Sequence, residues 1–318
     1  MTTASAPGKI IIFGEHAVVS GVTAIGAAID LRAKVTVHDK PGSVLINTKE
    51  LTLQGFSLDL TSGQLRSAQA EHAARYISAV LREFEAKDIQ VCIDSSLPLA
   101  AGLGSSACIV VAAVAAISRH QGLELPRKEI AEISYHLERK VQHGLGSPMD
   151  TALATYGGYL QVSRDILPLD LPLQEMVVGY TKMPHDTKYE VEKVQDLKKR
   201  YTDLVDPIFL AIEAISRRAV PLIREKNLAE LGRLMNVNHG LLAALGVSSR
   251  ELDELVHAAR GAGGALGAKL TGAGGGGCVI ALPGAAGVDA LMVAIRQAKG
   301  LPFKVTAGCE GVRLEDGL

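Results

Sequence analysis

Every position from Gly272 to Gly277 is glycine except Ala273. Because glycine loses more backbone entropy on folding than other residues, packing alone does not explain such a run. The simplest alternative is a flexible hairpin ahead of the strand-like segment 277–282. We interpret the run as a loop in which something large, such as a ligand, approaches the main chain. The fold must then place this loop at a binding site.

A second glycine-containing loop, Pro98–Ala107, leads into a helix. In it, Gly104 and Ser105 come just before the apolar, alanine-rich run 106–117, which predicts a buried helix. A helix N-terminus offers unpaired N–H groups and a positive dipole end to a phosphate, whereas an ordinary glycine turn with a serine cap is the alternative. The loop lacks the lysine of a P-loop and the third glycine of a dinucleotide-binding loop, so it matches neither pattern.

Hydrophobic patterns predict strands at 9–13, 33–38, 90–94, 157–162, 176–181, 277–282 and 303–307. They predict helices at 106–117 and 127–142, and several more over 203–260 with breaks near Asn227 and Gly246. Because strands and helices do not alternate as regular βαβ units, we expect an α+β fold. Prolines interrupt the pattern between residues 160 and 190, so we expect two domains, 1–170 and 171–318.

The chain carries 33 basic and 34 acidic residues, and this balance argues against a nucleic acid partner, which needs a basic surface. The four cysteines are far apart and form no C-x-x-C pair, so buried thiols are favoured over disulfides or a zinc site. The N-terminal residues lack the basic and apolar regions of a signal peptide. The apolar run 108–117 is too short to span a bilayer, so we expect a cytoplasmic protein without a membrane partner.

Three parts of the chain, in order, resemble the signature motifs of the GHMP kinases, a family of small-molecule kinases: Ser5–Lys9 with Phe13–Val19, then Pro98–Ala107, then Lys269–Cys278. Within that family, the mevalonate kinases are similar to this chain at Gly14–Val19, Ser147–Asp150 and 231–248. The resemblance covers nearly the whole chain. It implies an α+β N-terminal domain, a ferredoxin-like C-terminal domain and an active site between them.

The same resemblance implies ATP and Mg²⁺ as cofactors and mevalonate as the small-molecule substrate, whose primary hydroxyl receives the γ-phosphate. It implies that Asp150 accepts the proton of this hydroxyl and that Lys9 offsets the developing charge. It also implies that Ser106 and Glu138 bind Mg²⁺. Without the resemblance, a helix-capping Asp150, a surface Lys9 and a solvated Glu138 would be the simpler interpretations. We also expect a homodimer.

The resemblance further implies an ATP-binding set at the second motif: Pro98, Ala101, Gly102, Leu103, Gly104, Ser105, Ser106 and Ala107. It implies a substrate-binding set made of Glu15, His16, Ser147, Thr187 and Gly274. We expect His16 to bind the carboxylate or a hydroxyl of the substrate. Near His143 the chain is one residue longer than short archaeal members of the group, and we expect the extra residue in the loop after helix 127–142.

Two other kinds of function stay open at this point. Another GHMP enzyme, such as a phosphomevalonate kinase or diphosphomevalonate decarboxylase, should need additional Arg or Lys side chains for the substrate phosphate. Only Arg32 follows closely on residues 15–30. A ligand sensor without catalysis could keep the same fold. Such proteins often lose catalytic residues, whereas this chain has Lys9, Ser106, Glu138 and Asp150.

Overall fold

The structure, a computed structural model, describes residues 1–41, 45–50, 56–59, 70–98, 101–144, 146–184 and 186–315, and the side chains of these except 45–50, 56–59 and 70–73. Leu99 and Ala100 of the predicted phosphate loop lie outside the described residues. The strands are β1 (Thr2–Phe13), β2 (Ala24–Asp39), β3 (Leu45–Glu50), β4 (Phe56–Asp59), β5 (Ile89–Ser95), β6 (Tyr159–Val162), β7 (Ile166–Leu169), β8 (Gln174–Tyr180), β9 (Gly267–Thr271), β10 (Cys278–Leu282), β11 (Leu301–Ala307) and β12 (Arg313–Glu315). The helices are the short 3₁₀ helix η1 (Ala17–Ser20), α1 (Ala70–Glu83), α2 (Ser105–His120), α3 (Arg127–Val141), α4 (Pro148–Tyr156), α5 (Thr187–Arg200), α6 (Thr202–Arg224), α7 (Leu228–Ala244), α8 (Arg250–Arg260) and α9 (Gly287–Gln297).

These strands form one 12-stranded sheet whose main path runs β4-β3-β5-β2-β11-β8-β10-β9. The long strand β2 holds it together, because it pairs with β1, β5, β6 and β11. Along β1 and β2 the register puts Lys9 opposite Ala28 and Phe13 opposite Ile25. The order β11-β8-β10-β9 is the fourth, first, third and second strand of a βαββαβ unit, which is the ferredoxin-like arrangement. The expected α+β class is therefore confirmed.

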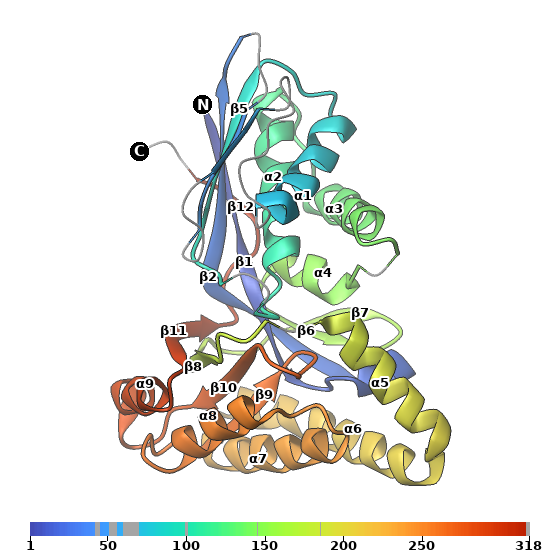
Figure 1. The fold of residues 1–318 in the computed structure, drawn as a ribbon, viewed down its shortest axis with the longest axis vertical. Coiled ribbons are helices and arrows are strands. Elements are labelled where there is room, and N and C mark those ends of the chain that lie inside the picture. The colour runs from blue at the N-terminus through green and yellow to red at the C-terminus, as the bar shows by residue number, and fades with distance from the viewer. Residues whose placement is uncertain are drawn as a thin grey trace.

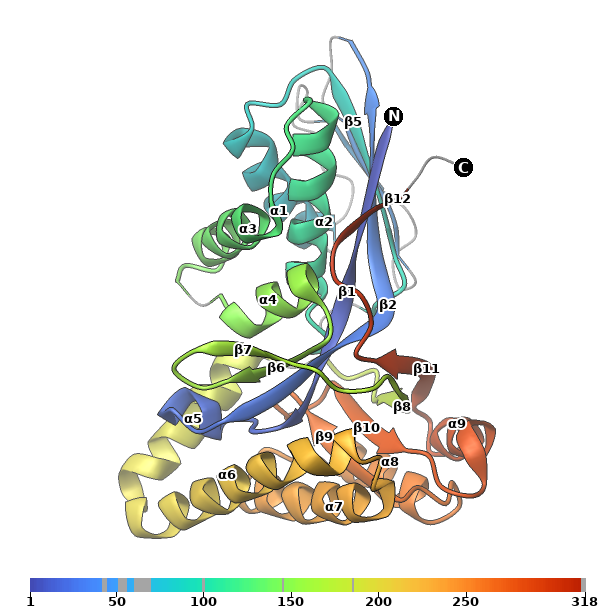
Figure 2. The same ribbon diagram turned by 180° about the vertical axis from the view of Figure 1, so that it is seen from behind.

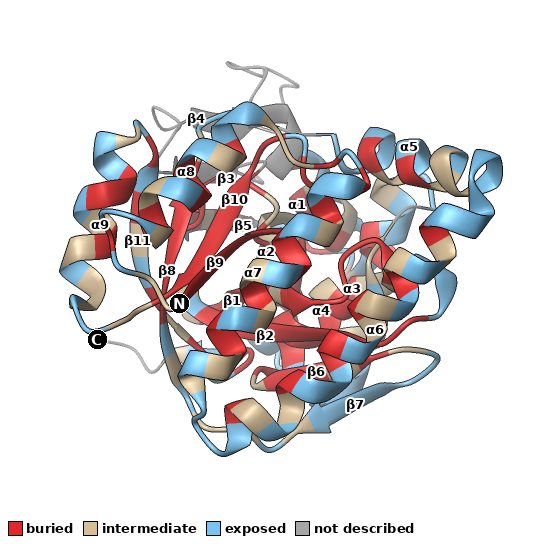
Figure 3. Cartoon of the chain, turned by 90° about the horizontal axis from the view of Figure 1, so that it is seen from below, coloured by how far each residue is buried: buried red, intermediate tan, exposed pale blue. Residues whose placement is uncertain are grey.

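Helices cover the sheet in two groups (Figures 1 and 2). Helices α1, α2 and α3 lie on one side of the upper strands, with α2 in contact with β1 and β2. Helices α7 and α8 lie against β9, and α9 lies against β8 and β11. Seen from below in Figure 3, the strands between these helices are buried while the helices turn exposed faces outward. The three sequence motifs therefore lie on or next to strands of this sheet: the first in β1, the second after β5 and the third between β9 and β10.

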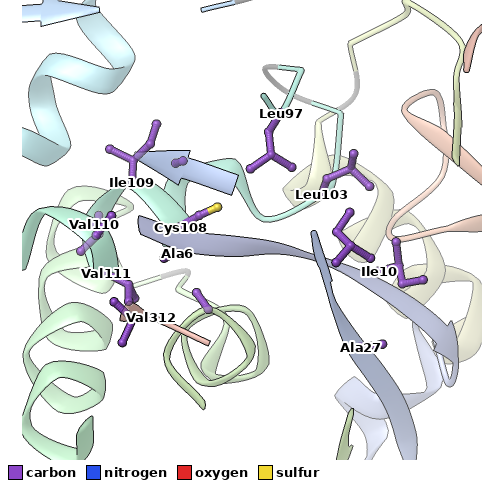
Figure 4. Packing of buried hydrophobic residues seen from close by; sticks show 14 of the residues in the cluster. Ala6, Ile10, Ala27, Leu97, Leu103, Cys108, Ile109, Val110, Val111 and Val312 are labelled. Atoms are coloured by element: carbon purple, nitrogen blue, oxygen red, sulfur yellow. The ribbon is translucent and has the colours of Figure 1, made fainter. Parts of the chain in front are cut away.

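Helix α2 is enclosed by the protein over most of its length, because every residue from Ala107 to Ser118 is buried. Figure 4 shows part of the surrounding core, with Ile10 from β1, Leu103 from the second glycine loop and Ile109 from α2. The backbone N–H of Lys9 donates to the Leu103 carbonyl at 2.9 Å, which ties that loop to β1. The start of α2 is thus fixed against the strand that carries Lys9.

Most predicted elements are confirmed, although several are longer than expected. The strands predicted at 9–13 and 33–38 are short parts of β1 and β2, and the predicted helical region 203–260 divides into α6, α7 and α8. Asn227 caps α7, and Gly246 ends the turn after it, so both predicted breaks are confirmed. The prediction missed the helices α1, α4, α5 and α9, the short η1, and the strands β3, β4, β7, β9 and β12. The domain boundary at 170/171 stays a prediction.

None of the four cysteines, all of which lie in the described ranges, forms a disulfide; Cys108 and Cys278 are buried, whereas Cys92 and Cys309 are half-buried. Burial raises the pKa of both thiols. The predicted burial is therefore confirmed for Cys108 and Cys278 and is only partial for Cys92 and Cys309. No helix within the described part of the chain is both long and apolar enough to cross a membrane.

Candidate functional site

A buried ion pair lies at the centre of the candidate site. Strand β1 carries Lys9 and the first turn of α4 carries Asp150, and Lys9 Nζ lies 3.4 Å from Asp150 Oδ1. The side chains are only 8% and 18% exposed, so Lys9 is not a surface charge. Ser147 caps α4: its hydroxyl accepts from the Asp150 N–H at 3.3 Å and donates to Asp150 Oδ1 at 2.9 Å. One serine therefore fixes both the helix start and the carboxylate.

The start of α2 lies beside this ion pair. Gly104 has φ +74°, and a Cβ at this position would lie 2.8 Å from Lys9 Cγ and 3.7 Å from Asp150 Oδ2. Only glycine combines this backbone conformation with that close approach. No side chain caps α2 at Gly104, so the first N–H groups of the helix are available to an anion. The Ser105 Oγ is buried without a partner among the described residues.

Glu138 of α3 enters the same site from the other side of α2. It is 2% exposed, so it is not a solvated helix charge. Ser106 and Gln142 donate to its Oε1, both at 3.1 Å, and Thr151 donates to its Oε2 at 3.0 Å. Burial, with a smaller contribution from Asp150, raises the pKa of Glu138 to about 7, although the hydrogen bonds oppose the shift. A buried carboxylate in this state favours a cation beside it.

The extra residue near His143 does not disturb this placement. Helix α3 ends at Val141, and His143 lies in the turn that follows, with φ 52°. Sequence reasoning missed Gln142 and Thr151, which hold the Glu138 carboxylate. Thr151 directly follows Asp150 on the same helix, and that adjacency is the only signal the sequence offers for it.

Glu15, a predicted substrate contact, meets protein groups on both carboxylate oxygens, and its contact with substrate stays a prediction. Lys269 of β9 forms an ion pair with Glu15 Oε1, and both side chains are 0% exposed. Asn238 of α7 donates to Glu15 Oε2 at 3.3 Å. Sequence reasoning did not place Lys269 or Asn238 in the site. A lysine between Ala268 and Leu270 on a strand would have been the signal for a buried charge needing a partner.

His16 is 5% exposed and its two ring nitrogens differ. Nε2 lies 2.8 Å from the Ala273 carbonyl oxygen, which only accepts, so Nε2 carries the proton. Burial lowers the pKa of His16 against the opposing effect of that hydrogen bond. The neutral ring therefore leaves Nδ1 as a bare acceptor, and Nδ1 is buried without a partner in the described chain. Of the two ligands expected for His16, a hydroxyl donor suits this nitrogen better than a carboxylate.

The third motif packs close to the first two. A Cβ on Gly272 would lie 3.7 Å from the Gly102 carbonyl oxygen, so the two glycine loops face each other. Gly274 has φ +79°, and a Cβ there would lie 2.1 Å from the Val247 carbonyl oxygen. Its close backbone approach is thus to the protein, and its predicted substrate contact stays a prediction. Thr187 is exposed at the start of α5.

The donor set at the start of α2 fits a nucleotide with a divalent cation. The unpartnered Ser105 Oγ and the open N-terminus of α2 suit phosphate oxygens, while Ser106 Oγ and Glu138 Oε1 lie 3.1 Å apart. Hard oxygen donors of this kind are those that Mg²⁺ prefers alongside phosphate. No group of three or more His, Cys, Asp or Glu side chains suited to a metal occurs in the described ranges.

A hollow of about 750 Å³ lies elsewhere, along α8 and the end of α9. Its lining includes Arg250, Asp253, His257 and Lys299, and none of the predicted site residues. Arg250 is paired with Glu254. Because none of the predicted site residues lines this hollow, its volume gives no reason to move the candidate site away from Lys9 and Asp150.

Comparisons with known proteins agree with the sequence motifs. The family model described as "GHMP kinases N terminal domain" matches residues 70–158, and "GHMP kinases C terminal" matches residues 219–299. The mevalonate kinase of Thermococcus sibiricus is 40% identical, over 98% of this chain and 98% of that protein. The crystal structure of the Methanococcus jannaschii mevalonate kinase has a TM-score of 0.83 at 29% identity, covering 96% of this chain and 98% of its own. That of the L. major mevalonate kinase in complex with R-mevalonate has a TM-score of 0.84 at 26% identity and covers 96% of each chain.

Proposed function

The chain belongs to the GHMP kinase family, and from this premise we propose that it transfers the γ-phosphate of ATP to the primary hydroxyl of mevalonate, giving 5-phosphomevalonate and ADP. Relatives about 40% identical over nearly the whole chain are mevalonate kinases, which confirms the predicted class of ATP-dependent phosphotransferase. The product belongs to isoprenoid biosynthesis.

The observation that carries the catalytic assignment is the buried Lys9–Asp150 ion pair beside the start of α2. Asp150 takes the proton of the mevalonate hydroxyl. The hydroxyl oxygen forms a bond to the γ-phosphorus of ATP, and the bond between the γ-phosphorus and the ADP oxygen breaks. Lys9 stabilises negative charge on the attacking oxygen and on the transferring group. Phosphoryl transfer depends mainly on such positioning and charge neutralisation, because its transition state is loose.

The second motif holds the nucleotide in this proposal. The N–H groups at the start of α2 and the Ser105 hydroxyl bind phosphate oxygens, and Gly104 lets them come close to Lys9. Ser106 and Glu138 would hold Mg²⁺, which when bound neutralises charge on the phosphates. The raised pKa of Glu138 supports this, since a carboxyl group that is hard to ionise alone gains from a nearby cation.

On the substrate side, His16 Nδ1 accepts a hydrogen bond from a hydroxyl of mevalonate. Its lone pair and lack of a described partner support this role. Ser147 acts through Asp150, whose carboxylate it orients. Thr187 and Gly274 stay predicted contacts, and the homodimer and the cytoplasmic location stay predictions as well.

A coupled assay of ADP release tests the function with mevalonate, phosphomevalonate, homoserine and galactose at equal concentrations. We expect the highest kcat/KM with mevalonate and loss of turnover when EDTA removes Mg²⁺. Faster turnover of phosphomevalonate would make the substrate assignment wrong. If the protein bound ATP but released no ADP with any of these alcohols, a ligand sensor without catalysis would be favoured.

A further inference from the structure

Lys269 is a fully buried lysine whose contacts are all within the protein. From β9 its ammonium group donates to Glu15 Oε1 and, at 2.8 Å, to the Leu270 carbonyl oxygen. It also lies 5.9 Å from the centre of the Phe13 ring, within the range of a cation–π contact. Burial lowers the pKa of Lys269 and the Glu15 carboxylate opposes that shift. The ion pair joins the first motif to the third.

Both carboxylate oxygens of Glu15 already accept from protein donors, and the side chain is closed to solvent. Lys269 occupies Oε1, Asn238 donates to Oε2 at 3.3 Å, and the side chain is 0% exposed. A carboxylate satisfied in this way can affect a substrate only through the backbone that carries it. The next residue along that backbone is His16.

His16 has a strained backbone. Its φ of 60° and ψ of −45°, with the Ala17 N–H donating to the Glu15 carbonyl oxygen at 2.7 Å, define a γ-turn with positive φ at its centre. This turn is rare and strained in L-residues, and such strain persists only where the surroundings enforce it. Here the turn is held by the Glu15–Lys269 pair before it and by the His16–Ala273 hydrogen bond within it.

We propose that Lys269 and Asn238 clamp Glu15 and thereby hold His16 in the strained turn that aims its Nδ1 at the substrate. Glu15 is then a positioning residue rather than a substrate ligand. The alternative is a pair that only stabilises the fold. A buried ion pair is poor support for that alternative, because two neutral side chains of similar volume are often as stabilising. The inference relies on the proposed function only for the identity of the substrate.

A double-mutant cycle separates positioning from stability, using Lys269→Met, Glu15→Gln and the double variant. Lys269→Met leaves a buried carboxylate unpaired, so we expect its Tm to fall by roughly 5–10 °C. The double variant removes both charges, so its Tm should recover most of that loss. If the charged clamp holds the turn, the KM for mevalonate should stay about tenfold or more above wild type in the double variant, while the KM for ATP changes by less than about twofold.

Lys304→Met is the matched control, because Lys304 also pairs with a glutamate, Glu175, but both side chains are about half exposed. It should change neither Tm nor either KM. A double variant that regains both Tm and the wild-type KM for mevalonate would overturn the clamp and leave a structural pair. Equal rises in both KM values would overturn it too. A wrong substrate assignment would show in the wild-type enzyme, whereas a wrong clamp would show only in the variants.

Discussion

Lys9 and Asp150 share one ion pair, so each is expected to matter through the other. If Asp150 accepts the substrate proton, Asp150→Asn should lower kcat by about 10²–10⁴-fold while the KM for mevalonate changes little. The amide keeps the shape and one acceptor for the Ser147 hydroxyl. Single-turnover kinetics with mevalonate checks this. A loss below tenfold would mean that Asp150 only orients the alcohol.

Lys9→Met tests the cation of the same pair. We expect a large loss of kcat, because charge on the transferring group is then uncompensated. The Lys9→Met/Asp150→Asn double variant should be little worse than the poorer single variant, since residues that act as a unit are not additive. Multiplicative losses in kcat would show that the two groups act independently.

At the scale of elements, the cap of α4 would couple the stability of that helix to the proposed catalysis. Ser147→Ala removes the hydrogen bonds that Ser147 makes to the Asp150 N–H and carboxylate. Losing an N-cap typically costs about 1 kcal/mol of unfolding free energy. Here we expect in addition a fall in kcat of roughly tenfold, because the catalytic carboxylate loses a fixed orientation.

Ser249→Ala is the matched control for this cap. Ser249 caps α8 through the Leu252 N–H at 3.4 Å, and it belongs to no predicted site. We expect a similar loss of stability in urea denaturation and an unchanged kcat. If both variants lost kcat equally, the effect of Ser147 would be one of stability alone.

His239 joins α7 to α8 and β9, since it lies 3.1 Å from Asp253 Oδ1 and accepts from the Leu270 N–H at 3.4 Å. Burial, together with Arg260 and Lys269, lowers its pKa from the usual 6.5 to about 4, while Asp253 opposes the shift. Between these values the unfolded chain binds the proton more tightly than the folded one. The neutral, buried His239 therefore makes its full contribution to the free energy of unfolding above pH 6.5, and that contribution is lost as the pH falls toward 4.

Urea unfolding from pH 7 to pH 4.5 checks this in His239→Gln against wild type. As the pH falls, we expect the free energy of unfolding to decrease less steeply in the variant than in wild type. The two slopes should differ by at most about 1.4 kcal/mol per pH unit. Glu138 acts in the opposite direction between 4.5 and about 7, because its pKa is raised on folding. Only the difference between the two proteins is therefore informative, and equal slopes would count against a titrating His239.

The sequence predicts those elements of the fold whose apolar residues recur with a clear helix or strand period, and it misses those in which other residues interrupt that period. Helix α2 was predictable because Ala107–Ser118 is buried on all sides and its sequence is apolar throughout. Strand β9 was missed because Gly267 and Lys269 interrupt its apolar pattern, although both are buried. The family resemblance gave Lys9, Asp150 and Glu138 but not the partners of Glu15. Those partners come from β9 and α7, and no local pattern reports a contact between residues 254 positions apart.

At the scale of the whole molecule, the two groups of elements are joined where β1 passes β9. The Thr271 hydroxyl accepts from the Ile11 N–H at 2.9 Å and donates to the Ile11 carbonyl oxygen at 2.8 Å. Thr271→Val keeps the volume but leaves both Ile11 groups without this partner. We expect the free energy of unfolding to fall by about 1–3 kcal/mol. Thr202→Val, at the exposed first residue of α6, loses a single hydrogen bond, and its free energy of unfolding should stay within about 0.5 kcal/mol of wild type.

The burial of α2 from Ala107 to Ser118 has a consequence for mutational tolerance. Five of its residues are buried alanines, Ala107, Ala112, Ala113, Ala115 and Ala116, and enlarging a residue in a packed core forces neighbouring side chains and backbone to shift. A shift of this helix would displace its N-terminus, which is the proposed phosphate site, so overpacking far from the first turn should also weaken ATP binding. Amino-acid substitutions should therefore accumulate slowly along the whole buried part of α2, including the helical turns that contact only other protein residues.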